Sequence, residues 1–288
     1  MKRQSAFLLV LLAAILWGTT GTTQTFVSEE ASPVLIGAIR IAIGGPALLL
    51  FAYFQGKVSH HGWKVMPVIV ASLGVASFQP LFFSAVKETG VAVGTVVAIG
   101  SAPILTGLLE WAIKKKFPER NWWFATLLAV TGCLLLVLND VQINVTVLGI
   151  LMALGAGFSF AVYTLVTKSL LEKHEPEAVM GAVFTLSAIY LLPVFFIFPI
   201  HSLLTPYGIS IVLYLGLFTT GFAYLCFARG LTGVSASTAI TLSLAEPLTA
   251  TLLGVIVVGE ILTLVAWAGV LLLFIGLGLL SFSPKVRQ

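Results

Sequence analysis

Ten apolar stretches, each long enough to cross a lipid bilayer as a helix, follow one another along this sequence. A spanning helix needs about 20 apolar residues to cross a hydrocarbon core of about 30 Å. The stretches are continuously apolar, whereas the strands of a membrane β-barrel alternate between apolar and polar residues. The sequence therefore predicts an all-α membrane protein with ten transmembrane helices, at residues 6–27, 34–54, 66–86, 91–113, 122–139, 147–168, 178–198, 208–228, 236–258 and 263–282.

Composition excludes the soluble classes of protein. Hydrophobic residues make up 59% of the chain and charged residues only 9%, whereas about a quarter of a soluble domain is charged. These figures exclude a water-soluble enzyme, a nucleic-acid-binding protein and a disordered chain. The sequence also lacks the HExxH, GxSxG and phosphate-binding-loop patterns and any spaced cluster of carboxylates. We therefore expect no enzyme activity, no metal and no cofactor.

The positively charged residues sort to one side of the predicted spans. Segments of membrane proteins that face the cytoplasm carry an excess of Lys and Arg. With a cytoplasmic N-terminus, Lys87 lies outside and Arg40 lies within a span, which leaves the other 13 of the 15 Lys and Arg residues inside. The sequence thus predicts a multi-pass protein of the inner (plasma) membrane with both termini in the cytoplasm. The inner residues are Lys2, Arg3, Lys57, Lys64, Lys114, Lys115, Lys116, Arg120, Lys168, Lys173, Arg229, Lys285 and Arg287.

The second half of the sequence resembles the first at a nearly constant shift. Ser101-Ala102-Pro103 aligns with Ala245-Glu246-Pro247, and Gly132 aligns with Gly276. We therefore divide the chain into two repeats, 1–141 and 142–288, with five predicted spans in each. Because five is an odd number, the second repeat is expected to enter the membrane upside down relative to the first. Inverted repeats are common in secondary transporters, which hold their substrate near the membrane centre between the halves.

The sequence resembles the EamA-type family of the drug/metabolite transporter superfamily over essentially its whole length. The resemblance rests on Trp17-Gly18 in the first span, Arg40 in the second, Pro103 in the fourth, Glu246-Pro247 in the ninth and Gly259-Glu260 after it. It implies two inverted five-helix repeats around a central cavity. It also implies export of small metabolites such as amino acids by alternating access, without naming the solute.

Two charged residues lie deep within predicted spans, where a charge in lipid costs at least about 2.5–3.5 kcal/mol. Glu246 lies near the middle of the ninth span, and Ser243 shares its helix face. Glu246 either binds a proton or a cationic group, or it pairs with Arg40 to fasten two helices together. Arg40 is nearer to the outer surface, and its long side chain either takes part in the site or extends to the interface. Glu110 and Glu260 lie close enough to helix ends to reach the interface.

One positive and one negative group suit a neutral or zwitterionic solute, such as an amino acid. A phosphate ester would need several cations. The remaining candidates are hydroxyl and aromatic residues, which either pack helices together or form the walls of a small-molecule site. Pro103 and Pro247 are expected to kink the fourth and ninth spans. The predicted cavity residues are Trp17, Thr22, Phe78, Gln79, Phe82, Tyr163, Thr220, Tyr224, Ser243 and Glu246.

Two alternatives to a metabolite exporter stay open at this point. A drug/proton antiporter of the multidrug type would use Glu246 for protons, and a channel-like facilitator would let the solute flow down its own gradient. The internal repeat favours a rocking carrier, because channel pores are usually built from rings of repeated groups. The expected partners are a small-molecule solute, the lipid bilayer and, for an antiporter, protons. The sequence indicates no nucleic-acid partner and no particular oligomeric state.

Overall fold

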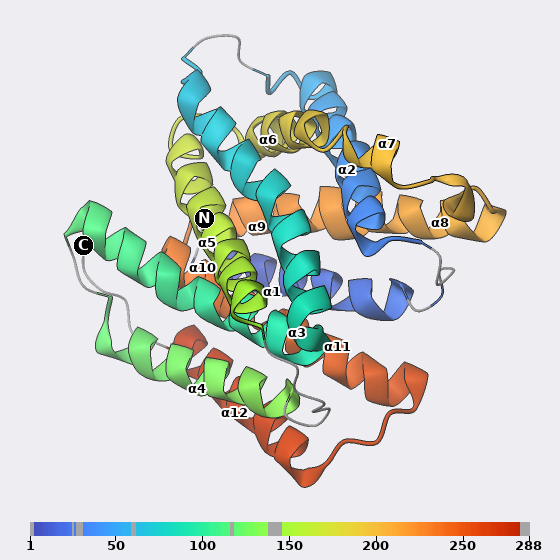
Figure 1. Ribbon diagram of the computed structural model, residues 1–288. Helices are drawn as coiled ribbons and strands as arrows, with labels where there is room; N and C mark the ends of the chain where they lie inside the picture. The colour runs from blue at the N-terminus through green and yellow to red at the C-terminus, as the bar shows by residue number, and fades with distance from the viewer. Residues whose placement is uncertain are drawn as a thin grey trace.

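The computed structural model describes residues 3–24, 26, 31–58, 62–115, 118–137 and 146–282, which form a bundle of helices (Figure 1). Within these residues, nine helical segments are long and apolar enough to cross a membrane, and a tenth, Arg120–Leu136, is shorter. The α-helices are α1 (Arg3–Gln24), α2 (Pro33–Phe54), α3 (Val65–Lys114), α4 (Arg120–Val137), α5 (Val147–Leu170), α6 (Pro176–Tyr190), α7 (Val194–Ile197), α8 (Pro206–Tyr214), α9 (Ala223–Leu231), α10 (Ala236–Leu242), α11 (Ala245–Leu253) and α12 (Leu264–Phe282). A 3-10 helix, η1 (His201–Leu203), and two π-helical segments, η2 (Leu215–Phe222) and η3 (Gly254–Val258), complete the order.

The prediction of ten membrane-spanning helices is confirmed, with ends that differ by a few residues. The third and fourth spans, Val65–Gly90 and Val93–Lys114, are joined directly within α3 at Gly90, which has φ 81° and ψ 158°. Essentially only glycine adopts this backbone conformation. Gly90 therefore turns the chain back into the membrane without a longer loop.

The ninth span is interrupted at its centre. It consists of α10, α11 and η3, and the α-helix breaks at Ser243 and Leu244. Pro247 explains the break, because proline lacks the N–H that would bond to the carbonyl of Ser243 and its ring clashes with that carbonyl. The N–H of Glu246 bonds to the Ser243 carbonyl instead, at 2.9 Å. The eighth span is likewise divided, into α8, η2 and α9.

At Pro103, where a kink was also expected, the fourth span keeps helical φ and ψ angles and has no break like that of the ninth span. The backbone of α3 keeps helical geometry on both sides of this residue. Close packing accounts for the difference: a Cβ added to Gly157 in α5 would lie 2.7 Å from the carbonyl oxygen of Ala98. The fourth span is thus held against α5 one turn before the proline.

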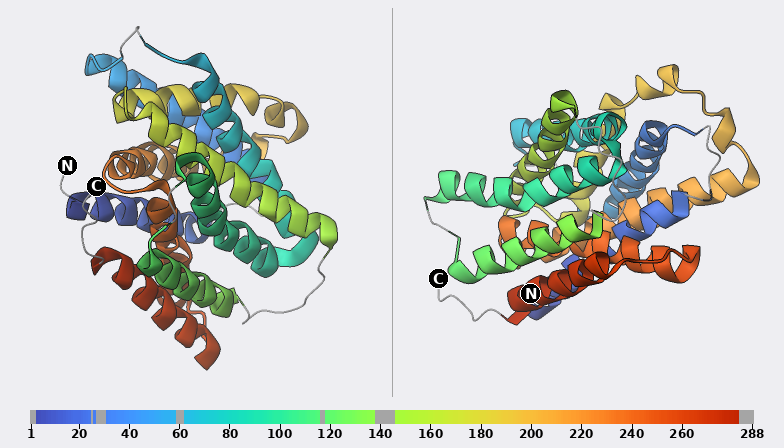
Figure 2. Two further views of the ribbon diagram at one scale, coloured as in Figure 1. Left: turned by 90° about the vertical axis from the view of Figure 1, so that its left-hand side faces the viewer. Right: turned by 60° about the horizontal axis from the view of Figure 1, so that its bottom comes forward.

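The principal helix–helix contacts join the two halves of the chain. α1 packs against α9 and α11, α2 against α6, α3 against α5, and α4 against α12. Figures 1 and 2 show α4 and α12 lying side by side at one edge of the bundle. Glycine permits the close approach between α2 and α6, where a Cβ on Gly45 would lie 2.6 Å from the backbone of Phe184. The core therefore lies between the halves.

α1 begins and α12 ends on the same side of the bundle (Figure 2), as an even number of crossings requires. We call this the basic end, because Lys57, Lys114, Lys168 and Arg229 follow or end helices there. The opposite end, where α1 ends and α2 begins, is called the α1–α2 end. Of the basic residues assigned to the inner side, Lys2, Lys116, Lys285 and Arg287 lie outside the described residues.

Candidate functional site

A cavity of about 390 Å³ lies between helices of the two halves. α1, α2, α3 and α4 contribute from the first half, and α5, α9 and the interrupted ninth span contribute from the second. Its polar lining residues are Thr20, Gln24, Arg40, Gln79, Thr95, Ser243, Glu246 and Thr251, and its aromatic residues are Trp17, Phe78, Phe82, Phe83, Phe160 and Tyr224. The cavity thus combines apolar walls with a few polar groups, as small-molecule sites usually do.

Trp17 connects the cavity to the buried core. Trp17 lines the cavity, yet only 5% of the residue is exposed. The ring centroid of Trp17 lies 4.6 Å from that of Tyr224, 5.3 Å from Phe227 and 6.2 Å from Phe160. Aromatic rings at these separations pack favourably. They form a floor that closes the cavity toward the basic end.

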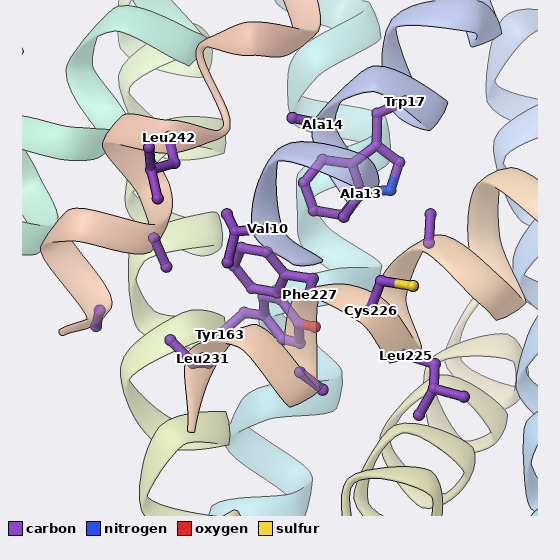
Figure 3. Packing of buried hydrophobic residues seen from close by; sticks show 14 of the residues in the cluster. Val10, Ala13, Ala14, Trp17, Tyr163, Leu225, Cys226, Phe227, Leu231 and Leu242 are labelled. Atoms are coloured by element: carbon purple, nitrogen blue, oxygen red, sulfur yellow. The ribbon is translucent and has the colours of Figure 1, made fainter. Parts of the chain in front are cut away.

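Below this floor, the space between the helices is filled by apolar side chains (Figure 3). Val10 of α1, Leu231 of α9, Tyr163 of α5 and Leu242 of α10 cluster there, all essentially inaccessible to solvent. Among the described residues, a cluster packed in this way leaves no path for a solute from the cavity to the basic end.

Arg40 and Glu246 line the same cavity from opposite halves of the chain, and both are half-buried. Among the described residues, no ion pair within 4.0 Å joins them. A buried charge without a counter-ion is costly. The cavity therefore has one cationic wall and one anionic wall. A ligand that carries both charges can pair with each of them.

The break in the ninth span sets the position of Glu246. The side chain lies in the first turn of α11, directly before the proline that ends the preceding helix. Gly18 of α1 allows this turn to come close, because a Cβ there would lie 2.7 Å from the carbonyl oxygen of Glu246. Ser243 also lines the cavity, but its hydroxyl donates to the carbonyl of Ile240 at 2.7 Å. The backbone break thus brings the Glu246 carboxylate to the cavity.

α3 supplies an aromatic wall. The rings of Phe78 and Phe82 stack at 5.5 Å, and Phe78 lies 5.8 Å from Phe160 of α5. Gln79, which is 3% exposed, lies over Gly37 of α2, where a Cβ would be 2.6 Å from its Oε1 atom. The missing side chain at Gly37 therefore makes room for the Gln79 amide beside Arg40.

A family model matches both halves of the chain. The model describes the EamA-like transporter family, and it matches residues 4–138 and again residues 147–282. The chain belongs to the EamA-like transporter family. The match covers both repeats, so this EamA-like transporter carries two copies of the family's unit, and it is a membrane transporter rather than an enzyme.

Relatives of this EamA-like transporter agree with the assignment. The chain is 50% identical over 288 residues to the uncharacterized transporter YwfM of Bacillus subtilis (strain 168), covering 100% of this chain and 97% of that protein. It is 24% identical over 287 residues to the uncharacterized inner membrane transporter YicL of Salmonella typhimurium, covering 96% and 95% of the two chains. A crystal structure of a protein 21% identical in sequence superimposes with a TM-score of 0.83 over 96% of each chain, which supports the fold.

The cavity of this EamA-like transporter brings together most of the residues selected from the sequence. Trp17, Arg40, Phe78, Gln79, Phe82, Tyr224, Ser243, Glu246 and Pro247 all line it. Three candidates lie outside the lining. Tyr163 is buried and its hydroxyl points to Met180 Sδ at 3.5 Å, Thr220 packs against Gly44, and Thr22 lies on another face of α1 than Trp17, Thr20 and Gln24.

The cavity also uses residues that the sequence pattern did not indicate. On α1, Trp17 and Thr22 were the predicted cavity residues, whereas the structure lines the cavity with Gly18 and with a set of four residues, Trp17, Thr20, Gly21 and Gln24. These residues recur at i, i+3, i+4 and i+7 from Trp17, a spacing that places them on one helix face. The spacing from Trp17 is therefore the sequence signal that indicates this face of α1.

Proposed function

We propose that this transporter exports small neutral or zwitterionic metabolites, amino acids foremost, by alternating access. The observation that carries the proposal is the pair of opposite charges, Arg40 and Glu246, lining one cavity without an ion pair between them. A carboxylate of the substrate would accept from the Arg40 guanidinium, and an ammonium group would donate to Glu246. Charge-assisted hydrogen bonds of this kind are among the strongest in proteins.

The size and walls of the cavity support a solute of amino-acid dimensions. Its volume of about 390 Å³ lies near the lower limit of the roughly 300–1,000 Å³ that small-molecule sites occupy. Phe78, Phe82 and Phe160 offer apolar contacts to a side chain. A phosphate ester would find a single cation, Arg40, beside an anion, which disfavours solutes of that class.

Counterflow in proteoliposomes tests this proposal. Vesicles preloaded with an unlabelled neutral amino acid should accumulate the same labelled amino acid transiently and saturably, whereas vesicles preloaded with a sugar phosphate should not. An imposed pH gradient should accelerate uptake if Glu246 exchanges protons for solute, and no response would favour facilitation without protons. Absence of counterflow for every neutral amino acid, or single-channel currents in planar bilayers, would refute the carrier proposal.

We further infer that the basic end faces the cytoplasm and that the chain resides in the inner (plasma) membrane. The excess of Lys and Arg at that end supports this orientation, and the Salmonella relative is named as an inner membrane protein.

Cysteine labelling in whole cells tests the orientation. Lys64 and Lys87 are exposed lysines beside different ends of the third span, so Lys64→Cys and Lys87→Cys are matched reporters. In a background of Cys133→Ala and Cys226→Ala, an impermeant maleimide should label Lys87→Cys in intact cells. It should label Lys64→Cys only after the cells are permeabilised. The reverse pattern would contradict the orientation.

A further inference from the structure

Among the described residues, the lining of the cavity lies toward one end of the bundle. Its lining comes from the second half of α1, the first half of α2 and the segments of α3 on either side of Gly90. Leu136 at the end of α4 and Thr251 in α11 lie toward the same end. All of these segments lie on the α1–α2 side of the floor formed by Trp17. Among the described residues, the cavity is therefore approached from the α1–α2 end, while the basic end is closed.

A buried carboxylate joins three helices at the closed basic end. Glu177, in the first turn of α6, is 1% exposed. Its Oε1 atom accepts from Lys57 Nζ, just beyond α2, at 2.9 Å, and also from Arg229 Nη2 in the last turn of α9. The predicted spans end at 168 and resume at 178, which leaves Glu177 in the connecting segment. The structure instead places it inside the bundle.

A second carboxylate joins the halves at the same end. Glu110, expected at the interface, is buried at 7% exposure. Its Oε1 accepts from Lys114 Nζ at 2.7 Å and its Oε2 from the backbone N–H of Ser237 in α10 at 3.1 Å. Next to it, Lys168 Nζ donates to the carbonyl of Leu231 at 2.8 Å. The basic end is thus closed by charged contacts as well as by apolar packing.

Two of these contacts cross from one repeat to the other. Lys57 belongs to the first repeat and Glu177 to the second, and Glu110 of the first repeat holds Ser237 of the second. Toward the other end, α1 and α8 meet through a neutral pair, Thr19 Oγ1 and Tyr214 OH, at 2.9 Å. If the repeats rock against each other to open the basic end, the charged contacts between them must separate first.

The exposure of the partners makes the contact around Glu177 releasable. The side chains of Lys57 and Arg229 are 33% and 44% exposed, so water can hydrate both cations when they part from the carboxylate. Glu177 has no such access while the end is closed, and its Oε2 atom has no hydrogen-bond partner among the described residues. Since a buried carboxylate needs its counter-ions far more than partly exposed cations need it, the cluster stabilises the closed arrangement specifically.

We propose that Glu177 is the central residue of a gate, formed with Lys57 and Arg229, which holds the basic end closed while the cavity is open at the α1–α2 end. The inference rests on the proposed alternating-access function, and it adds the residue that controls which end is open. The gate acts through the position of the helices, so Glu177 is a positioning residue that does not touch the solute.

Two cysteine reporters in purified, detergent-solubilised protein test the gate without any substrate. Val10→Cys reports on the basic end, because Val10 is fully buried beneath the floor and packs against Gly230, the neighbour of Arg229. Thr95→Cys reports on the α1–α2 end, because Thr95 lines the cavity close to the start of the fourth span at that end. Both reporters are placed in the Cys133→Ala, Cys226→Ala background. Labelling is measured without any solute, so it tests the gate alone. An error in the proposed substrate class would appear in the counterflow assay and not in the labelling rates.

Glu177→Gln keeps the shape of the side chain and removes its charge. We expect it to raise the rate of maleimide labelling at Val10→Cys by about tenfold, the effect of losing about 1.4 kcal/mol of closed-state stabilisation, and to lower the rate at Thr95→Cys. Lys57→Met should act in the same direction and serves if Glu177→Gln does not fold. Lys64→Met, an exposed lysine near Lys57 without a described acidic partner, is the matched control and should change neither rate.

The opposite changes at the two reporters distinguish a gate from a structural fastening. If the cluster only fastens helices, its loss either leaves both labelling rates at the wild-type value or raises both together through loosening of the bundle. Either result, obtained with folded Glu177→Gln or Lys57→Met protein, would overturn the proposal.

Discussion

Glu246→Gln and Arg40→Ala are each expected to reduce amino-acid counterflow by about a hundredfold or more. Each change leaves one charge of a bound zwitterion without its partner in a buried site, and breaking a buried charge pair costs about 3–5 kcal/mol. Since about 1.4 kcal/mol corresponds to a factor of ten, the loss exceeds two powers of ten. Both residues line the cavity, so initial rates of counterflow at several solute concentrations measure the effect directly.

Glu172→Gln is the control for this pair. It removes a negative charge from an exposed residue in the turn between α5 and α6, and we expect its counterflow to match the wild type. The proposed role of the two charges would be refuted if Glu246→Gln and Arg40→Ala both transported every tested amino acid at the wild-type rate. A solute with a blocked amino group distinguishes the roles further, because it should lose affinity for the wild type but little for Glu246→Gln.

Gly276→Val is expected to destabilise the protein severely, by about 1–3 kcal/mol or more, as inserting a side chain into a close-packed contact does. A Cβ at this position in α12 would lie 2.7 Å from the carbonyl oxygen of Ala125 and 2.9 Å from the backbone nitrogen of Ala129, both in α4. Backbone atoms cannot rotate away, so α4 and α12 must separate. Thermal unfolding of the purified protein, followed by size-exclusion chromatography, measures the loss.

The same helix offers a matched control two residues later. A Cβ at Gly278 would meet no atom within 4 Å, so Gly278→Val introduces the same side chain into the same helix without a clash. We expect its unfolding temperature to stay close to that of the wild type. Equal losses for the two variants would mean that the helix propensity of valine, and not the α4–α12 contact, determines the effect.

The sequence predicts most of the fold because lipid imposes the same requirement on every span. A helix in lipid must satisfy its backbone internally and be about 20 residues long, so apolar length alone locates each span. Composition does not reveal the backbone conformation within a span. The π-helical η2 and the continuous helix through Pro103 depend on packing partners in the other half, such as Gly44 beside Gly216 and Gly157 beside Ala98.

The candidate site could be predicted where a residue type is rare within a membrane. Arg40 and Glu246 stand out because charge is scarce in the spans, and both line the cavity. Threonines are common in spans and pack helices as often as they line cavities, so Thr22 and Thr220 were not distinguishable from Thr20 by type. Glu177 was missed because a charge at a helix start is usually solvated. Only its partners in α2 and α9 reveal that it is buried.

Each half of the chain is stabilised mainly by contacts with the other half. α1 packs against α9 and α11, α2 against α6, and α4 against α12. The stretch matched twice by the family model is therefore a unit of sequence but not a unit of folding. A half expressed on its own would expose to lipid the glycine-containing helix faces that otherwise pack against the other half. During synthesis, the first five spans are therefore made before the helices against which they pack.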